Sequence, residues 1–282
     1  MYHPTLKSPG ILILANCLLL LLAQSVSAAE QSEVGIWESS LRNTYFGTSE
    51  IEENNDIIQI EAPKRAEDPA LLPLKIKTGI PQSEQHYIKS VSLIIDRNPD
   101  PLAGVFHFTP DNGKADLELR VRLDQYSHVR AIAEMNDGKL YMTSRYVKGS
   151  GGCSAPAAGD LAAAMARLGK IKLQTGAPSA DTDSPLVSAM LRISHPNITG
   201  MQKNQMTQLF YPSHYVQEVK VKLDDKPIFS AELGISISEN PSFLFYLSPE
   251  QSGRLTAEIR DSEDLTFVHT EEVRIKSVKG AS

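Results

Sequence analysis

Apolar and polar residues alternate with a period of two along much of this chain, and this pattern constrains the fold more than any other feature. The pattern is clearest in residues 87–147, where the segment 117–123 places Arg120 and Arg122 opposite an apolar face. A period of two puts successive side chains on opposite faces of a strand, so it predicts half-buried β-strands. The turn sequence Asn-Asp-Gly at 136–138 is typical of a hairpin. Short strands with regular turns predict an antiparallel sandwich.

The second half of the chain shows the same alternating pattern. Strands are expected over residues 186–194, 215–223, 228–233, 243–247, 254–260 and 266–275. Helices are expected over residues 34–45 and 159–169, and residues 175–184 have the composition of a linker. The sequence therefore predicts an all-β protein with two β-sandwich domains, joined by a Gly/Ala-rich segment, a short helix and a linker.

The first 29 residues have the pattern of an export signal. Lys7 precedes an apolar run over residues 11–22, and small residues follow at 26–29. The apolar run is too short to cross a hydrocarbon core of about 30 Å comfortably. We therefore expect cleavage near Ala28 or Ala29, a periplasmic protein, and no membrane attachment after cleavage.

Charge and cysteine content narrow the function classes. The net charge is −6 and the sequence pI is near 5.7, which argues against nucleic acid or an anionic membrane as the main partner. Cys17 lies in the predicted signal, so the mature protein would carry Cys153 as its single thiol. One unpaired cysteine in an exported protein indicates either intermolecular pairing or a working thiol.

Cys153 lies in a segment of residues with very small side chains, Lys-Gly-Ser-Gly-Gly-Cys-Ser-Ala-Pro-Ala-Ala-Gly at 148–159. Such a segment has little apolar surface to bury, so we expect it to be mobile and exposed. Gly149, Gly151 and Gly152 would then form a flexible arm that presents the thiol. Lys148 and Arg145 are close enough in sequence to favour a thiolate, although the sequence leaves open where they point.

From Leu71 to Ile275 the chain resembles the SoxYZ sulfur carriers of periplasmic sulfur oxidation, and more closely the fused SoxYZ-like carriers associated with quinoprotein dehydrogenases. The resemblance rests on Gly151-Gly152-Cys153, on Ile-Ser-His-Pro at 193–196, on Gly200, on Pro-Ser-His-Tyr-Val-Gln-Glu-Val at 212–219, and on Glu-Asn-Pro at 239–241. It implies two immunoglobulin-like domains and the following division of the chain: a signal (1–29), a SoxY-like domain (30–152), an arm, short helix and linker (153–184), and a SoxZ-like domain (185–282).

The resemblance also implies a function without catalysis. Cys153 would be the covalent attachment residue for a sulfur-containing group, which is presented to periplasmic enzymes, and no cofactor or metal would be needed. Quinoprotein dehydrogenase systems are candidate partners. One departure is informative, because Ser154-Ala155-Pro156 replaces the glycines that usually follow the cysteine. An arm continued into a second domain sweeps less space, and Pro156 stiffens it, so cargo and partners can differ from those of the family.

Three alternatives remain open from the residues. A thiol enzyme would need a base for Cys153, and the candidate bases in the mature chain are His86, His107, His128, His195, His214 and His269. A copper-handling protein would use Met190, His195, Met201 and Met206, which lie close in sequence. The third alternative is a structural or docking module beside a periplasmic dehydrogenase, with an incidental cysteine.

Overall fold

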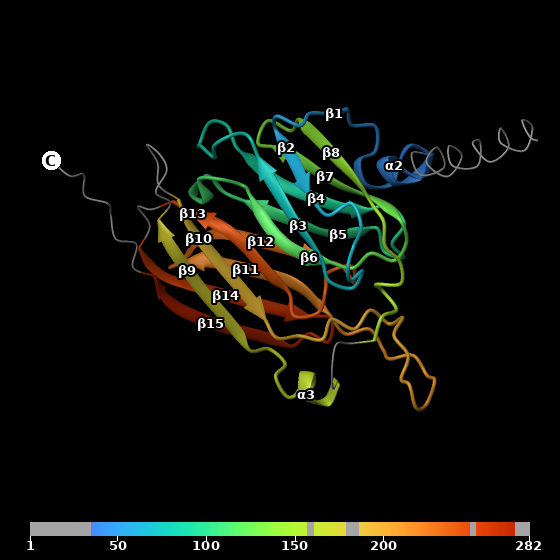
Figure 1. Cartoon of the computed structure of the whole chain (residues 1–282). Coiled ribbons are helices and arrows are strands. Elements are labelled where there is room, and N and C mark those ends of the chain that lie inside the picture. Colours follow the sequence, from blue (N-terminus) through green and yellow to red (C-terminus); the bar gives the residue numbers. More distant parts are fainter. Residues whose placement is uncertain (1–34, 157–160, 179–185, 249–251, 274–282) are drawn as a thin grey trace, which may run out of the picture. The chain divides into compact units, whose positions relative to one another are not determined.

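The computed structural model describes residues 35–156, 161–178, 186–248 and 252–273 (Figure 1). The predicted signal (1–29), the predicted helix start at 159–160 and most of the predicted linker lie outside the described residues. The chain divides into a unit that ends at Thr48 and a unit that begins at Ser49, and each is described by itself. In the first unit, η1 (Trp37–Leu41) continues into α2 (Arg42–Phe46), as the sequence predicts. Among the described residues, no helix is long and apolar enough to cross a membrane.

The second unit is built from two β-sheets, which confirms the all-β class. The nine-stranded sheet has the order β1-β8-β7-β4-β5-β12-β11-β14-β15, and the six-stranded sheet has the order β2-β3-β6-β13-β10-β9. The strands of the first half are β1 (Ile51–Glu53), β2 (Ile58–Glu61), β3 (Leu72–Thr78), β4 (Ile88–Ile95), β5 (Leu102–Phe108), β6 (Leu117–Val121), β7 (Ser127–Met135) and β8 (Leu140–Val147). Those of the second half are β9 (Ile171–Pro178), β10 (Val187–Ile193), β11 (Val216–Leu223), β12 (Lys226–Leu233), β13 (Ser242–Leu247), β14 (Gly253–Asp261) and β15 (Thr266–Val273). Two short helices, η2 (Pro110–Asn112) and α3 (Leu161–Met165), lie in the connections.

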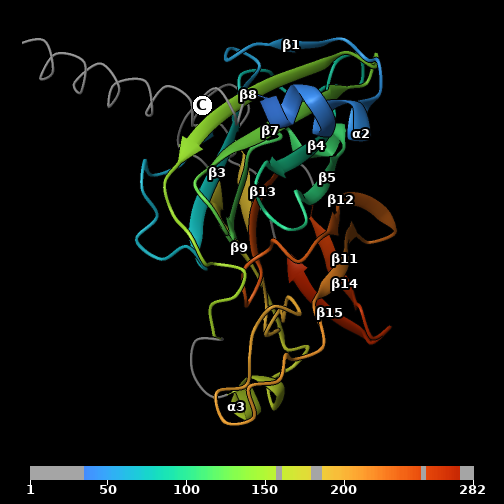
Figure 2. The same ribbon diagram turned by 90° about the vertical axis from the view of Figure 1, so that its right-hand side faces the viewer.

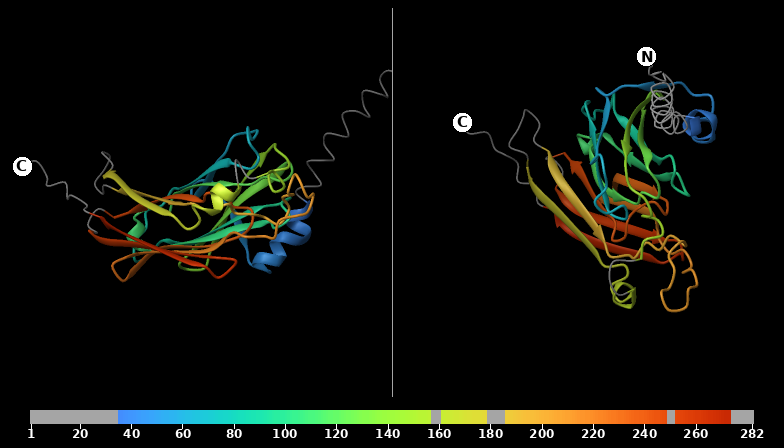
Figure 3. Two further views of the ribbon diagram at one scale, coloured as in Figure 1. Left: turned by 90° about the horizontal axis from the view of Figure 1, so that it is seen from below. Right: turned by 45° about the vertical axis from the view of Figure 1, so that its right-hand side comes forward.

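Both sheets run through both halves of the chain (Figures 2 and 3). In the larger sheet β5 pairs antiparallel with β12, for example Phe108 with Phe229. In the smaller sheet β6 pairs with β13 through Glu118 and Leu244. The two predicted sandwiches are therefore hydrogen-bonded into continuous sheets, and a linker is not the only connection between them.

One hydrophobic core fills the space between the sheets and draws on both halves. The strands follow the predicted alternation, and in β3 every second residue is buried. The rings of Phe229 and Phe245 stack with centroids 4.7 Å apart, and Phe106 of the first half lies 6.5 Å from Phe229. Burying each such side chain stabilises the fold by about 1.5–3 kcal/mol, so this core fixes the two halves against each other.

Two local predictions were wrong. The region assigned to a linker from residue 175 begins inside β9, which pairs with β10 as the edge of the smaller sheet. Ile171 and Leu173 alternate with Lys172 and Gln174, so the strand signal was present but was overridden by the Gly and Pro that follow. The segment 117–123 does not stay in strand throughout: β6 ends at Val121, and Arg122 is buried with 1% exposure, although the pattern predicted it on the polar face.

Candidate functional site

Cys153 lies in a tight turn just after β8, and its side chain is completely buried. Gly149 and Gly152 are buried as well, whereas Gly151 is exposed with φ of 80°. The expectation that this segment is exposed is therefore wrong for Gly149, Gly152 and Cys153 and holds for Gly151. The small side chains allow the segment to pack closely against its neighbours. Glycine permits either close packing or a flexible backbone, and here the segment is packed.

Main-chain hydrogen bonds hold the turn against the segment that follows β6. The N–H of Gly151 donates to the carbonyl oxygen of Asp124 (2.8 Å), and the N–H of Gly152 donates to that of Leu123 (3.0 Å). A Cβ atom on Gly152 would lie 2.2 Å from the carbonyl oxygen of Pro69 and 2.7 Å from that of Leu123. Glycine is required at position 152 because two backbones meet there.

The side chain of Arg122 contacts the cysteine turn. Its Nη1 donates to the carbonyl oxygen of Gly152 (3.1 Å), and its Nη2 donates to that of Asn197 in the second half (3.3 Å). The guanidinium thus connects the cysteine-bearing turn with the loop that follows β10. Burial lowers the pKa of Arg122, because desolvation disfavours its charged form.

Thr199 holds the turn from the other side. Its Oγ1 donates to the carbonyl oxygen of Cys153 (2.7 Å), and its own N–H donates to Oε1 of Gln202 (2.8 Å). Both Thr199 and Gln202 are buried. The main chain on each side of the thiol is therefore fixed by residues of both halves.

Buried polar side chains join the two halves around Arg122. Asn98 donates to the carbonyl oxygen of Arg122 (2.8 Å) and to Oγ of Ser236 (2.9 Å). In the second half, the N–H of Val216 donates to Oδ1 of Asn197 (3.1 Å). Asn197 has a positive φ of 44°, a conformation that asparagine tolerates better than most residues. These buried polar residues form a layer that is hydrogen-bonded from one half of the chain to the other.

The residues that carry the family resemblance lie beside this layer. The N–H of Asn240 donates to the carbonyl oxygen of His195 (2.8 Å). Ile198 and His214 exchange two main-chain hydrogen bonds, of 2.7 and 2.9 Å. These motifs therefore shape the loop that supplies Asn197 and Thr199 to the cysteine turn. Sequence reasoning found the motifs but missed Arg122, Asn197 and Thr199, because nothing in their spacing relates them to Cys153.

The thiol is protonated and unreactive in this conformation. Burial, with a smaller contribution from the charge of Asp124, raises the pKa of Cys153 from 9.0 to about 12, although the nearby guanidinium of Arg122 opposes both. Lys148 and Arg145 are not among the charges that act on the thiol. No histidine is among the charges that act on the thiol either.

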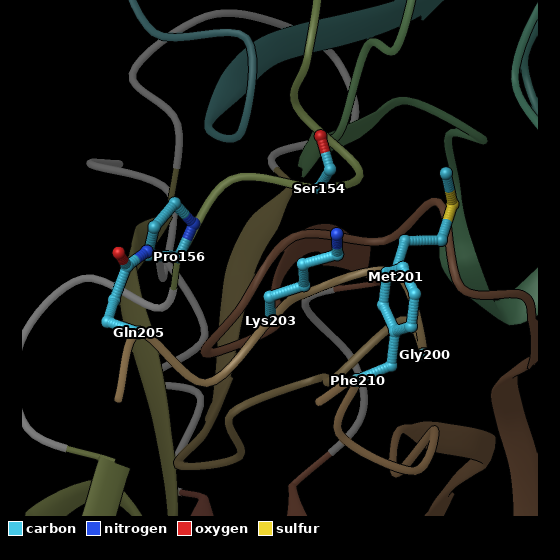
Figure 4. Close-up of a pocket in the computed structure, with 7 residues that line it drawn as sticks. All are labelled: Ser154, Pro156, Gly200, Met201, Lys203, Gln205 and Phe210. Carbon is cyan, nitrogen blue, oxygen red and sulfur yellow. The ribbon is translucent and has the colours of Figure 1, made fainter. Parts of the chain in front are cut away.

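A pocket open to solvent lies directly beside the turn (Figure 4). Its volume is about 560 Å³, and it is lined by Ser154, Pro156, Gly200, Met201, Lys203, Gln205 and Phe210. Ser154 follows Cys153 in the chain, and Gly200 follows Thr199, so the cysteine turn and the loop that holds it both border the pocket. Nζ of Lys203 lies 4.9 Å from the centre of the Phe210 ring. The pocket thus combines apolar walls with one ammonium group.

His195, His214 and Asp261 form a buried cluster with the residue types of a metal site. Nε2 of His214 lies 2.8 Å from Oδ2 of Asp261, and Nε2 of His195 lies 3.5 Å from the same oxygen. However, Nδ1 of His195 accepts the N–H of Asn197 (3.0 Å). The neutral ring then carries its proton on Nε2, the atom that faces the cluster, and a protonated nitrogen cannot coordinate a metal. The residues do not fit a metal centre.

The copper alternative gains no support from the methionines. Met206 is 94% exposed, whereas His195 is buried, so the two do not share one binding site. Burial and the neighbouring His214 lower the pKa of His195 to about 4. The imidazole is therefore neutral at ordinary pH and serves as an acceptor that fixes the loop carrying Asn197.

Comparison with known families assigns both halves. Residues 42–153 match the family of sulfur oxidation protein SoxY, and the match ends at Cys153. Residues 176–272 match the family of sulphur oxidation protein SoxZ. None of the curated proteins that were compared with the chain matches it.

Among solved structures, the sulfur carrier protein SoxY from Chlorobium limicola f thiosulfatophilum is 30% identical, with a TM-score of 0.36, and covers 42% of this chain and 99% of its own. A superoxide reductase (neelaredoxin) from Ignicoccus hospitalis is 21% identical, with a TM-score of 0.30, and covers 33% of this chain and 78% of its own. The assignment rests on the two family matches, which confirm the resemblance seen in the sequence. The chain belongs to the SoxYZ family of sulfur oxidation carrier proteins, in a fused form that holds the SoxY and SoxZ domains on one polypeptide.

Proposed function

We propose that this protein bears a sulfur-containing group covalently on Cys153 and presents it to partner enzymes in the periplasm. The observation that carries the proposal is the position of Cys153, which ends the SoxY match and is enclosed by residues of both halves. It is also the only cysteine among the described residues. A carrier needs one attachment atom and no catalytic base, and this arrangement agrees with that requirement.

Loading requires the turn to open. The nucleophile is the thiolate, and burial keeps the proton on Cys153 while the turn is closed. Ser154, the residue after Cys153, borders the pocket of about 560 Å³, so a group on an opened turn would have this space beside it. Exposed apolar side chains lie on the loop that forms the pocket: Met206, Leu209 and Phe210 are 94%, 69% and 60% exposed. Such a patch is typical of a surface that contacts other proteins, which supports presentation to partners.

Mass spectrometry of the intact protein tests the carrier function. Protein isolated without reducing agent should contain a fraction with added mass on the peptide that includes Cys153, and the addition should be removed by a thiol reductant. Cys153→Ser should lack it, whereas Ser154→Ala, a matched change one residue away, should retain it. A thiol that is always unmodified in native preparations would contradict the proposal.

A second candidate function is a structural or docking module beside a quinoprotein dehydrogenase, and the complete burial of the thiol favours it. Genetic complementation separates the two candidates. Cys153→Ala would restore function fully in a docking module and would abolish it in a carrier. Copurification with a dehydrogenase in both the wild type and Cys153→Ala would support the second candidate.

Export is part of the proposal, because the family acts on sulfur compounds outside the cytoplasm and the first 29 residues have a signal pattern. N-terminal sequencing of the mature protein should begin near Glu30. A mature chain that begins at Met1 would contradict periplasmic localisation.

A further inference from the structure

Arg122 is a buried cation, and the negative charges that act on it, those of Glu239 and Asp68, form no ion pair with it. Its side chain is 1% exposed, and both Nη atoms donate to main-chain carbonyl oxygens, of Gly152 and Asn197. Nε has no hydrogen-bond partner, and among the described residues no carboxylate forms an ion pair with Arg122. Burying a charge without an ion pair is costly, so a core position such as this is expected to hold an apolar residue unless the charge has a task.

The two carbonyl oxygens identify that task. Gly152 directly precedes Cys153, and Asn197 lies two residues before Thr199, which binds the carbonyl oxygen of Cys153. The guanidinium therefore connects the cysteine turn with the loop that holds it. Hydrogen bonds from a charged donor are about twice as strong as neutral ones, so this contact outweighs each neutral bond made by the turn.

The other contacts of the turn involve neutral groups only. Gly151 and Gly152 donate through their main-chain N–H groups to the carbonyl oxygens of Asp124 and Leu123. Thr199 contributes one neutral side-chain bond. Among these residues, Arg122 is the one that is charged and buried and that bonds to both halves of the chain.

We propose that Arg122 is a positioning residue that latches the Cys153 turn in its closed, unreactive conformation and so sets how often the thiol becomes available. This inference rests on the proposed carrier function and adds its regulation: the empty carrier is protected, and opening breaks the Arg122–Gly152 bond. Arg122 keeps its bond to Asn197 when the turn opens, so the guanidinium stays in place for reclosure.

The test is the rate at which iodoacetamide alkylates Cys153 in the native full-length protein, read by mass spectrometry of the peptide that contains it. The wild type should react far more slowly than the denatured chain. Arg122→Met should react about 10- to 100-fold faster, the factor expected for loss of one charge-assisted hydrogen bond. Arg122→Lys, which keeps the charge but cannot bind both carbonyl groups, should be intermediate.

The matched control is Arg120→Met, two residues away on β6. Arg120 is partly exposed and donates to the carbonyl oxygen of Asn240 (3.2 Å), away from the cysteine turn. Its alkylation rate should stay within about twofold of the wild type. Low urea should leave the rate in Arg122→Met nearly unchanged, because local opening exposes little surface, whereas global unfolding responds steeply.

Should Arg122→Met fail to fold by circular dichroism, Arg122→Lys carries the comparison. A folded Arg122 variant that reacts at the wild-type rate, or more slowly, would overturn the latch. That outcome would leave the carrier function untouched, because the adduct on Cys153 is measured separately. Absence of any adduct, conversely, would not alter the alkylation rates.

Discussion

Thr199 Oγ1 donates a 2.7 Å hydrogen bond to the carbonyl oxygen of Cys153, so a residue of the SoxZ half holds the cysteine of the SoxY half. The bond is buried. It is intramolecular because the two domains share one chain. The accessibility of the thiol therefore depends on residues more than forty positions away in sequence, as the separation of 46 residues between these partners shows.

Replacing Thr199 with valine should loosen the cysteine turn modestly. Valine keeps the shape of threonine but removes the hydroxyl that donates to Cys153 and accepts the N–H of Met201. Only the first of these bonds holds the turn, and one neutral hydrogen bond is worth about 1 kcal/mol. Alkylation of Cys153 should therefore accelerate by about fivefold. Thr256→Val, the same change at an exposed site, is the control, and equal rates in the two variants would show that Thr199 does not hold the turn.

The glycines of the turn should differ in their tolerance of alanine. Gly152→Ala places a Cβ against two carbonyl oxygens, so it should expose the thiol and cost about 2–3 kcal/mol of unfolding free energy. Gly151→Ala points into open space, and its cost of about 1 kcal/mol comes from the positive φ alone. Urea unfolding monitored by circular dichroism measures both. Equal and small costs would mean that the glycines serve flexibility.

The alkylation rate of Cys153 should keep rising above pH 9. Burial raises the pKa of the closed thiol from 9.0 to about 12, so the closed turn keeps its proton while an opened thiol ionises. The stabilisation of the closed form is complete below pH 9 and is lost as the pH rises towards 12. The rate should thus increase about tenfold per pH unit through this window. A plateau near pH 9, as in a short Gly-Gly-Cys peptide, would indicate an exposed thiol.

His195 should remain neutral, with its proton on Nε2, as the pH falls to about 4. Burial is the main cause of this lowered pKa, and His214 adds to it. Because the folded pKa lies below the ordinary value of 6.5, the stability linked to this group is present above pH 6.5 and is lost between pH 6.5 and 4. NMR of the imidazole nitrogens measures both the tautomer and the titration. A proton on Nδ1 at neutral pH would reopen the metal interpretation of the cluster.

Much of the fold could be predicted because strand periodicity is a local property. The alternation in β3 and the Asn-Asp-Gly turn between β7 and β8 are visible within a few residues, and both appear in the structure. β9 was missed because Gly176 and Pro178 lie within it, and both residues normally break strands.

The environment of the candidate site could not be predicted, because it is assembled from distant segments. The sequence identifies Cys153 but suggests a mobile arm, since glycine permits both flexibility and close packing. Which of the two occurs depends on Pro69, Leu123 and Arg122, and their proximity is set by the sheets. Arg122 in particular follows an alternating strand, where the pattern places it in solvent.

The pairing of β5 with β12 makes each half an incomplete protein. Cutting the chain between the halves would leave β5 and β6 as unprotected sheet edges, which invite aggregation. Covalent fusion supplies the complementary strands at a fixed, high local concentration. Translation of one chain therefore produces both components in equal amounts, and dilution cannot dissociate them.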